Sequence, residues 1–357
     1  MVDYELKNKV AIITGANNPG GIRATTALAF AREGAKVVLV YKKIDRPFDA
    51  TKTDRHGADR YYGANAGDAS AVEAKLKDMN ADYLIIESDI SNEDCVKKIY
   101  VETLKMYGNV DILVNNAADG DMDGIDTIEK ITQKVIDDTF AVNVRGSIMM
   151  TREFVNNRGD FGRIINISTD AAQVFAGQIT YGASKATLEA LTRSIALEVA
   201  AYGITVNCVA PGPTQTGWID RELEEAVLPL IPMGRLIEPS DIAGFVHDAG
   251  QPTTHFNVLK ERGFDPWKVV IDDAAPIYHI GDAKEYSPML FIVSDNDMKN
   301  RYEQTQMTLS TNRVTRMRSS TEALVWSILA FSFSTFRDLK AINSFASFTK
   351  FFLISKP

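Results

Sequence analysis

Short runs of Val and Ile recur up to about residue 210 and alternate with longer stretches of helical character. They predict strands near residues 9–13, 36–41, 83–87, 110–114, 163–167 and 204–209. Continuous apolar runs are typical of strands buried on both faces, and their alternation with helices predicts an α/β fold with a doubly wound parallel sheet. Ligands bind at the carboxyl ends of such strands, so the polar residues there are the candidate site.

The first strand runs into a glycine-rich turn, which is followed by an Ala-rich helix from Ala24 to Arg32. Glycines in such a turn let backbone N–H groups approach a pyrophosphate, and the helix N-terminus adds positive potential. A glycine-rich turn alone is a weak signal, but strand, turn, helix and second strand occur here in order. The turn residues that we expect at a dinucleotide are Gly15, Asn17, Gly20, Gly21 and Ile22.

An acid/base pair follows the fifth strand. Tyr181 and Lys185 stand one helical turn apart, and Ser168 precedes Tyr181 by thirteen residues. This spacing places a phenol and an ammonium on one helix face, with a hydroxyl arriving from a strand. A nearby cation favours the phenolate, which brings proton exchange with a carbonyl or an alcohol within reach. On its own, Tyr-x-x-x-Lys is also compatible with an ordinary helix start.

Together, these ordered motifs resemble the short-chain dehydrogenase/reductase family, and specifically its members similar to 3-oxoacyl-carrier-protein reductases, over about residues 5–246. The resemblance implies a Rossmann sheet, a nicotinamide cofactor and a catalytic tetrad. By that resemblance Tyr181 is the general acid/base, Lys185 binds the ribose and perturbs the tyrosine, Ser168 orients the substrate oxygen, and Asn143 holds a water for proton relay. Asp89 stands where the family contacts the adenine.

Two departures from the family pattern stand out. Arg23 occupies the place of the third glycine, so it either points to solvent or loosens the cofactor cradle. Counting back from Tyr181 selects Ser168 as the catalytic hydroxyl, whereas aligning Asn166-Ile-Ser-Thr with the family motif selects Thr169. We prefer Ser168.

Charge at the end of the second strand bears on the choice of cofactor. Tyr41, Lys42 and Lys43 stand where NAD-preferring sites carry a carboxylate, which favours NADP(H) over NAD(H), although lysines at a solvated strand end would look the same. The complete set of residues expected at the cofactor is Gly15, Asn17, Gly20, Gly21, Ile22, Tyr41, Lys42, Asp89, Ile90, Asn116, Ala117, Tyr181, Lys185, Pro211, Gly212, Thr214 and Thr216.

Two segments between the motifs are candidates for covering the site. An insert at 43–80 separates the second and third strands, and it is either a lid over the adenosine side or a surface excursion without function. Within the segment 214–232, Trp218, Leu228 and Ile231 are candidates for an apolar substrate pocket, although core packing would explain them equally well.

The chain departs from the family after residue 246, where the last family strand is not visible, so we expect an irregular C-terminal extension. Residues 247–310 resemble a C-terminal fragment of an α/β-hydrolase esterase, in which Asp297 would be the triad acid. No Gly-x-Ser-x-Gly elbow occurs, and no histidine follows Asp297, so we do not expect esterase activity. Residues 311–357 are Ser- and Phe-rich, and we expect a disordered or artefactual tail from a recombined or mis-assembled reading frame.

Composition limits the functions that remain. A net charge of −8 without a basic stripe argues against nucleic-acid binding. The apolar runs are too short for a membrane span. The four histidines lack metal-ligand spacing, so we do not expect a zinc site. Because the first residues lack an apolar signal segment, we expect a cytoplasmic protein. We predict an NADP(H)-dependent oxidoreductase for a carbonyl or secondary alcohol, with a possible homodimer through the Tyr181–Ala201 helix. The alternative is a catalytically degenerate nucleotide-binding chain.

Overall fold

The computed structural model describes residues 6–120, 124–172, 176–231, 234–249 and 291–292. They form one sheet in the order β3-β2-β1-β4-β5-β6-β7, and its first six strands are parallel. The strands are β1 Val10–Thr14, β2 Lys36–Tyr41, β3 Tyr83–Glu87, β4 Ile112–Asn115, β5 Gly162–Ile167, β6 Ile204–Val209 and β7 Phe291–Ile292. The predicted doubly wound Rossmann sheet is confirmed, and each of the six predicted strands is present.

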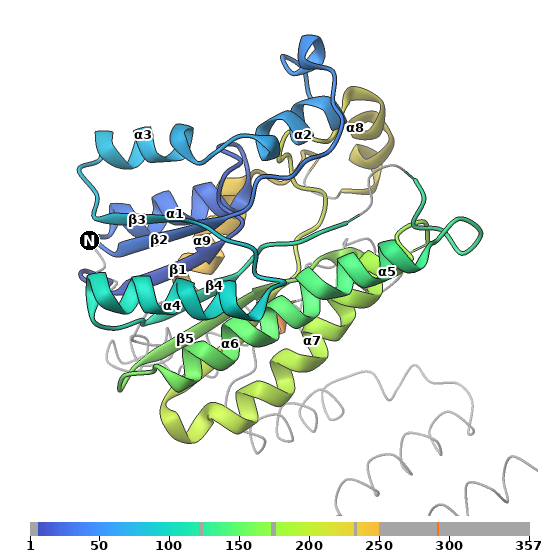
Figure 1. Cartoon of the computed structure of the whole chain (residues 1–357). Helices are drawn as coiled ribbons and strands as arrows, with labels where there is room; N and C mark the ends of the chain where they lie inside the picture. Colours follow the sequence, from blue (N-terminus) through green and yellow to red (C-terminus); the bar gives the residue numbers. More distant parts are fainter. Residues whose placement is uncertain (1–5, 121–123, 173–175, 232–233, 250–290, 293–357) are drawn as a thin grey trace, which may run out of the picture. The chain divides into compact units, whose positions relative to one another are not determined.

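Helices cover both faces of this sheet (Figure 1). The α-helices are α1 Ile22–Arg32, α2 Ala58–Ala66, α3 Ser70–Asp78, α4 Glu93–Tyr107, α5 Gln133–Phe140, α6 Ser147–Asn156, α7 Ile179–Val199, α8 Arg221–Val227 and α9 Pro239–Ala249. The shorter helices are η1 Ala50–Lys52, η2 Ala141–Gly146, η3 Asp170–Ala172, η4 Ala200–Tyr202 and η5 Leu228–Leu230. Of these, η2 is a π-helical segment.

Alternation along the strands divides the core between the two faces. In β1, Ala11 and Ile13 face a cluster with α1, α3 and α9, whereas Val10 and Ile12 face a cluster with α4, α6 and α7. Successive side chains of a strand point to opposite faces, so a strand buried on both sides must be apolar throughout. This requirement explains why the apolar runs of the sequence located the strands.

Helix α4 shows how local sequence sets the bounds of an element. The Asn92 side chain accepts hydrogen bonds from the N–H groups of Asp94 and Cys95, and Gly108 ends the helix with φ 80°. An asparagine N-cap satisfies backbone donors that lack a helical partner, and glycine adopts the left-handed C-terminal conformation without a Cβ clash. The bounds of this helix are therefore set by its own sequence.

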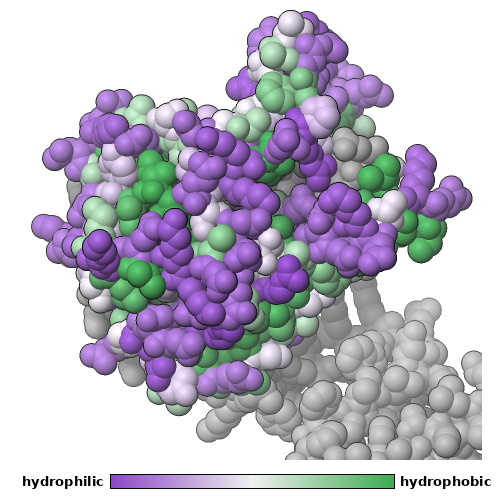
Figure 2. Space-filling view, in the orientation of Figure 1, coloured by the Kyte–Doolittle hydropathy of each residue, from purple (hydrophilic) through white to green (hydrophobic). Residues whose placement is uncertain are grey.

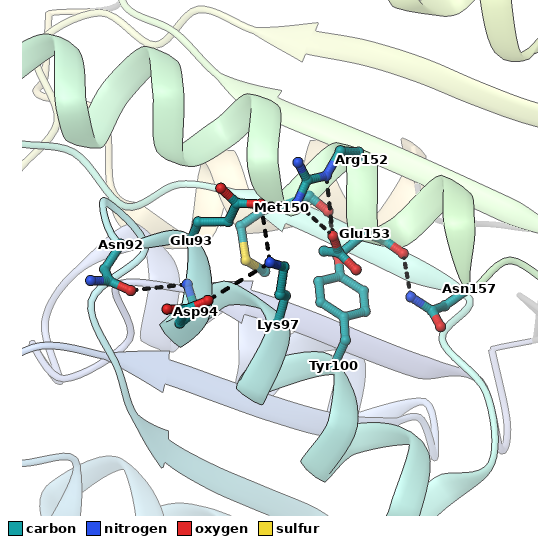
Figure 3. Close-up of polar contacts among 9 residues, drawn as sticks. All are labelled: Asn92, Glu93, Asp94, Lys97, Tyr100, Met150, Arg152, Glu153 and Asn157. Carbon is teal, nitrogen blue, oxygen red and sulfur yellow. Dashed lines mark hydrogen bonds and ion pairs between the residues drawn. The ribbon is translucent and has the colours of Figure 1, made fainter.

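Helices α4 and α6 are joined by buried and exposed polar contacts (Figure 3). The fully buried Tyr100 donates its hydroxyl hydrogen bond to the Met150 carbonyl at 2.7 Å, and Arg152 reaches Glu93 at 2.9 Å. The exposed ion pair adds little to stability, while the buried hydrogen bond fixes how the two helices pack.

The insert between β2 and β3 folds into η1, α2 and α3 and is anchored to the glycine-rich turn. Asn17 donates to the carbonyl oxygens of Asn65 and Gly67 at 2.7 and 3.1 Å, and Gly57 N–H donates to the Gly217 carbonyl at 2.9 Å. The insert is therefore attached to both the turn and the segment that follows β6, and it is not a free surface excursion.

Beyond β6, the only strand that the described residues add to the sheet is the two-residue strand β7, which pairs antiparallel with Cys208 and Val209. The expected hydrolase-like triad acid Asp297 and the segment 311–357 lie outside the described residues. Among the helices of the described part, none has the length and hydropathy needed to cross a bilayer. Figure 2 shows that the face in view is mostly hydrophilic, with hydrophobic side chains in separate small patches.

Candidate active site

The first turns of α7 carry Tyr181 and Lys185, and a buried carboxylate holds this end of the helix. Asp126, which is fully buried, accepts hydrogen bonds from the Thr180 N–H, the Thr180 hydroxyl and the Tyr181 N–H, at 2.8, 2.6 and 3.0 Å. A carboxylate at a helix N-terminus satisfies the free N–H groups and favours the helix dipole. Asp126 therefore fixes the backbone position of Tyr181.

Lys185 is buried, and its Nζ donates a hydrogen bond to the Ile167 carbonyl at 2.7 Å. Burial lowers the pKa of Lys185 to about 8, because a charged ammonium is poorly solvated there, and the nearby Arg23 charge lowers it further. Its Nζ lies 5.8 Å from the centre of the Tyr181 ring. The lysine and the tyrosine are thus neighbours, as their helical spacing predicts.

Burial raises the pKa of Tyr181 to about 12, and the neighbouring Tyr61 and Asp170 act in the same direction. Arg23 opposes this rise, because a positive charge stabilises the phenolate. The phenol is therefore protonated at neutral pH. In that state it can donate a proton to an oxygen on which negative charge develops.

The two candidate hydroxyls are engaged differently. The Ser168 Oγ, in a buried residue, donates to Glu189 Oε1 at 2.7 Å. The Thr169 Oγ1 donates to Asp170 Oδ1 at 3.1 Å, and it accepts from the Ala171 N–H at 3.3 Å. Burial raises the pKa of Asp170. The sequence motifs did not single out this residue. The proton of Ser168 has the shorter, more enclosed acceptor.

Asn143 lies in the π-helical segment η2 and is fully buried. Its side-chain oxygen accepts from the Asp119 N–H at 2.7 Å, and its Nδ2 donates to the Asp119 carbonyl and to Ser184 Oγ at 2.8 and 2.9 Å. The π-turn aims the amide inward, as π-bulges at functional sites often do. Asn143 thus connects the segment after β4 to helix α7.

Thr14 joins the ends of β1 and β4 below the glycine-rich turn. Its hydroxyl donates to the Val114 carbonyl and accepts from the N–H groups of Asn116 and Ala117. Gly15 has φ +83°, and a Cβ there would meet Ala117 Cα at 3.0 Å. Only glycine fits this position, which keeps the strand ends close together.

Two observations indicate that a dinucleotide fits this turn. Helix α1 has Gly21 as its N-cap residue and therefore no side-chain cap, so its first N–H groups are available to an anion. The buried Nδ2 of Asn116 has no hydrogen-bond partner among the described residues, although a buried donor usually has one. Both features suit a ligand rich in acceptors, such as the phosphates and ribose of a dinucleotide.

Two cavities hold most of the predicted site residues. The substrate-side cavity, of about 410 Å³, is lined by Gly21, Ile22, Asn116, Ser168, Thr169, Tyr181, Lys185, Pro211, Gly212, Thr214 and Thr216. The adenosine-side cavity, of about 680 Å³, is lined by Gly15, Asn17, Tyr41, Lys42, Asp89, Ile90 and Ala117. Gly20 instead lines a third cavity, and the buried Asn143 lines none of these three cavities.

The end of β2 is charged and already paired. Lys42 Nζ lies 2.7 Å from Asp89 Oδ2, and Lys43 Nζ lies 3.5 Å from Glu87 Oε2. The Lys42 ammonium lowers the pKa of Asp89, although partial burial of that carboxyl acts in the opposite direction. These exposed lysines remain available to a phosphate at the adenosine-side cavity, since exposed ion pairs are weak.

Sequence reasoning missed part of the substrate-side wall. Tyr61 and Tyr62 of the insert line this cavity together with Asp170 and Gln178. The aromatic pair was visible in the sequence, but no local pattern shows that α2 lies over the site. Trp218 lines the cavity as expected, whereas its apolar neighbours there are Ile219, Leu223 and Val227 rather than Leu228 and Ile231.

The fold and the site define a dinucleotide-binding α/β protein with a Tyr/Lys pair at the strand ends. Its residues 49–247 match the family model described as enoyl-(acyl carrier protein) reductase. The chain is 32% identical to a 3-oxoacyl-[acyl-carrier-protein] reductase of Synechocystis, over 68% of this chain and 88% of the relative. It is 33% identical to NADPH-dependent aldehyde reductase 2, chloroplastic, of Arabidopsis thaliana, over 69% of this chain and 90% of the relative.

Solved structures agree with these relatives. A dehydrogenase/reductase of Sinorhizobium meliloti, 30% identical, matches with a TM-score of 0.58 over 71% of this chain and 93% of that one. The chain belongs to the short-chain dehydrogenase/reductase family. Its relatives are oxidoreductases, which supports NAD(P)-dependent oxidoreduction in general.

Proposed function

We propose that this protein is an NADP(H)-dependent oxidoreductase that interconverts a small-molecule carbonyl compound and its alcohol. The observation that carries the proposal is that Tyr181, Lys185 and a hydroxyl from the end of β5 line one cavity beside the glycine-rich turn. Acid/base groups beside a dinucleotide crevice are what hydride transfer to a carbonyl requires.

The cofactor would lie along the carboxyl edge of the sheet. Lys42 and Asp89 would meet its adenosine end, Gly15 and Gly21 would approach its phosphates, and Lys185 would hold the ribose next to the nicotinamide. When bound, the nicotinamide supplies or accepts the hydride. The pair Lys42 and Lys43 at the end of β2 supports preference for a 2′-phosphate, as does the NADPH dependence named for an Arabidopsis relative.

In reduction, Tyr181 would donate its hydrogen bond to the carbonyl oxygen and release the proton as that oxygen becomes an alkoxide. A phenol with a pKa of about 12 is protonated at neutral pH and therefore ready for this direction. Lys185 would hold its ammonium near the phenolate that forms, and Arg23 would add a second positive charge. Both cations stabilise the product side of the proton transfer.

A hydroxyl donor beside Tyr181 would support the same substrate oxygen. We assign this role to Thr169, because the Ser168 proton is committed to the Glu189 carboxylate at 2.7 Å. The Thr169 proton has a longer contact of 3.1 Å with Asp170, which a developing oxyanion can replace. Asn143, hydrogen-bonded to Ser184 beside the pair, would hold a relay water.

The test combines cofactor titration with turnover. We expect the full chain to bind NADPH saturably and more tightly than NADH in a fluorescence titration, and to reduce members of a ketone and aldehyde panel. Tyr181→Phe should lower turnover by at least about 100-fold, because general acid catalysis contributes that much, while leaving NADPH affinity within about threefold.

The outcomes separate the alternatives. Retained turnover in Tyr181→Phe would remove Tyr181 from its role. Saturable binding without turnover of any panel member would support the catalytically degenerate nucleotide-binding alternative. Absence of both would refute the cofactor assignment itself.

A further inference from the structure

A partition separates the adenosine-side cavity from the substrate-side cavity. Five residues line both cavities and therefore stand between them: Arg23, Ile44, Arg46, Ala118 and Asp119. A dinucleotide that reaches from the end of β2 to Tyr181 must cross this partition. Its diphosphate is the part of the molecule that lies midway between the two ends.

Arg23 contributes the first cation of the partition. Its Nε donates to the Asn116 carbonyl at 3.2 Å and its Nη1 donates to the Gly15 carbonyl at 3.1 Å. The side chain therefore lies across the glycine-rich turn and does not point out to solvent. Its two acceptors are neutral carbonyls, and a phosphate oxygen is a stronger partner for a guanidinium than either of them.

Arg46 contributes the second cation, and it comes from the insert. Its Nη2 lies 3.1 Å from Asp119 Oδ1, and each of the two side chains keeps about a quarter of its surface exposed, at 26% and 25%. This ion pair ties the insert to the segment that follows β4, across the crevice. Because the pair is partly solvated, an anion can exchange with the Asp119 carboxylate at modest cost.

Asn116 provides an independent indication of a ligand at this point. Within the part of the chain that the structure describes, its buried Nδ2 lacks a partner, and its carbonyl already accepts from Arg23. A ligand that supplies acceptor oxygens here would accept a hydrogen bond from the Asn116 amide. The same ligand would compete with the Asn116 carbonyl for the Arg23 guanidinium. Backbone N–H groups at the start of α1 add further donors beside this amide.

We propose that Arg23 and Arg46 form a cationic clamp on the diphosphate of the dinucleotide, an inference that rests on the proposed function. On binding, Arg23 exchanges its contacts with the Gly15 and Asn116 carbonyls for the diphosphate, and Arg46 exchanges Asp119 for it. Arg23 stands at the place of the third family glycine, so in this chain that position of the turn carries a positive charge. One arm comes from the glycine-rich turn and the other from the insert, so cofactor binding also fixes the insert over the substrate-side cavity.

Isothermal titration of the full chain tests the clamp with two probes. NADPH carries the diphosphate, whereas adenosine 2′-monophosphate reaches only the adenosine-side cavity. For Arg23→Gln and for Arg46→Gln we expect the NADPH dissociation constant to rise about 10- to 100-fold, the loss typical of a charge-assisted hydrogen bond. Affinity for adenosine 2′-monophosphate should stay within about threefold, and the salt dependence of NADPH binding should weaken.

Arg60→Gln is the matched control. Arg60 belongs to the same insert, is exposed, and lines only the third cavity, so its loss should leave NADPH affinity unchanged. Arg23→Lys should retain part of the affinity, since it keeps the charge without the planar fork. Thermal denaturation of each variant would show that the fold is retained.

Three outcomes would overturn the clamp. If the unaltered chain binds NADPH and both glutamine variants bind it equally well, the clamp fails while the proposed function stands. Tighter NADPH binding by Arg23→Gly would show that Arg23 only obstructs the crevice. Absence of NADPH binding by the unaltered chain would overturn the clamp and the proposed function together.

Discussion

Gly120 lies against the ring of Tyr181, so a single added methyl group tests the role assigned to that ring. A Cβ at Gly120 would stand 2.9 Å from Tyr181 Cδ2 and 3.4 Å from its Cε2. Contacts below 3.0 Å essentially never occur for real Cβ atoms. Gly120 does not have a positive φ, so alanine is compatible with its backbone and the strain falls on the contact.

The size of the effect follows from this overlap. To reach ordinary contact at 3.4 Å, the Tyr181 ring must move by about 0.5 Å. The new Cβ of residue 120 is bonded directly to the backbone, so it cannot rotate away from the ring. A misplacement of about 1 Å at a reacting group can cost on the order of 100-fold in rate. For Gly120→Ala we therefore expect turnover to fall by about 10- to 100-fold, with NADPH affinity within about threefold.

The assay is steady-state reduction of the best substrate found in the carbonyl panel, with NADPH titration on the same preparations. Gly159→Ala is the control, because Gly159 is exposed and a Cβ there meets nothing within 4 Å. The double variant Gly120→Ala/Tyr181→Phe should be no slower than Tyr181→Phe alone, since the displaced hydroxyl is already absent.

Equal turnover in Gly120→Ala and the unaltered chain would refute the reasoning, because the ring would then not need its position. An additive loss in the double variant would show that the methyl group acts elsewhere than on the Tyr181 hydroxyl.

Two further predictions concern the core and the pH dependence. Tyr100→Phe should lower the free energy of unfolding by about 1 kcal/mol, because it removes the buried hydrogen bond to the Met150 carbonyl at 2.7 Å. Urea denaturation measures this loss, and an unchanged midpoint of unfolding would contradict the prediction. Asp170→Asn should shift the alkaline rise of alcohol oxidation to lower pH. The Asp170 carboxylate raises the pKa of Tyr181, so its neutral replacement lets the phenolate form earlier; a shift in the opposite direction in the pH–rate profile would disprove this.

The strands were predictable from the sequence, because burial on both faces leaves little choice of residue. The run near 110–114 is β4 at Ile112–Asn115, and the run near 204–209 coincides with β6. Topology made it predictable that polar residues after several strands would line common cavities, since parallel strands bring their carboxyl ends to one edge.

Side-chain partners distant in the sequence were not predictable. Nothing local to Ser168 shows that Glu189 takes its proton, and nothing local to Tyr181 shows that Asp126 holds the start of its helix. The insert is a similar case, because its placement depends on Asn17 reaching the carbonyls of Asn65 and Gly67. Such contacts arise only when the whole chain has packed.

The attachment of the insert has a consequence for how this protein can vary in sequence. The Asn17 side chain donates hydrogen bonds to main-chain oxygens of the insert. In the same way, the Asn18 side chain donates to the Thr216 main-chain oxygen at 3.1 Å. Because the acceptors are main-chain oxygens, these hydrogen bonds do not depend on the side chains of the residues that they hold. Replacing Tyr61 and Tyr62 would therefore leave these anchors in place, so the wall of the substrate-side cavity can change in sequence while the glycine-rich turn stays the same.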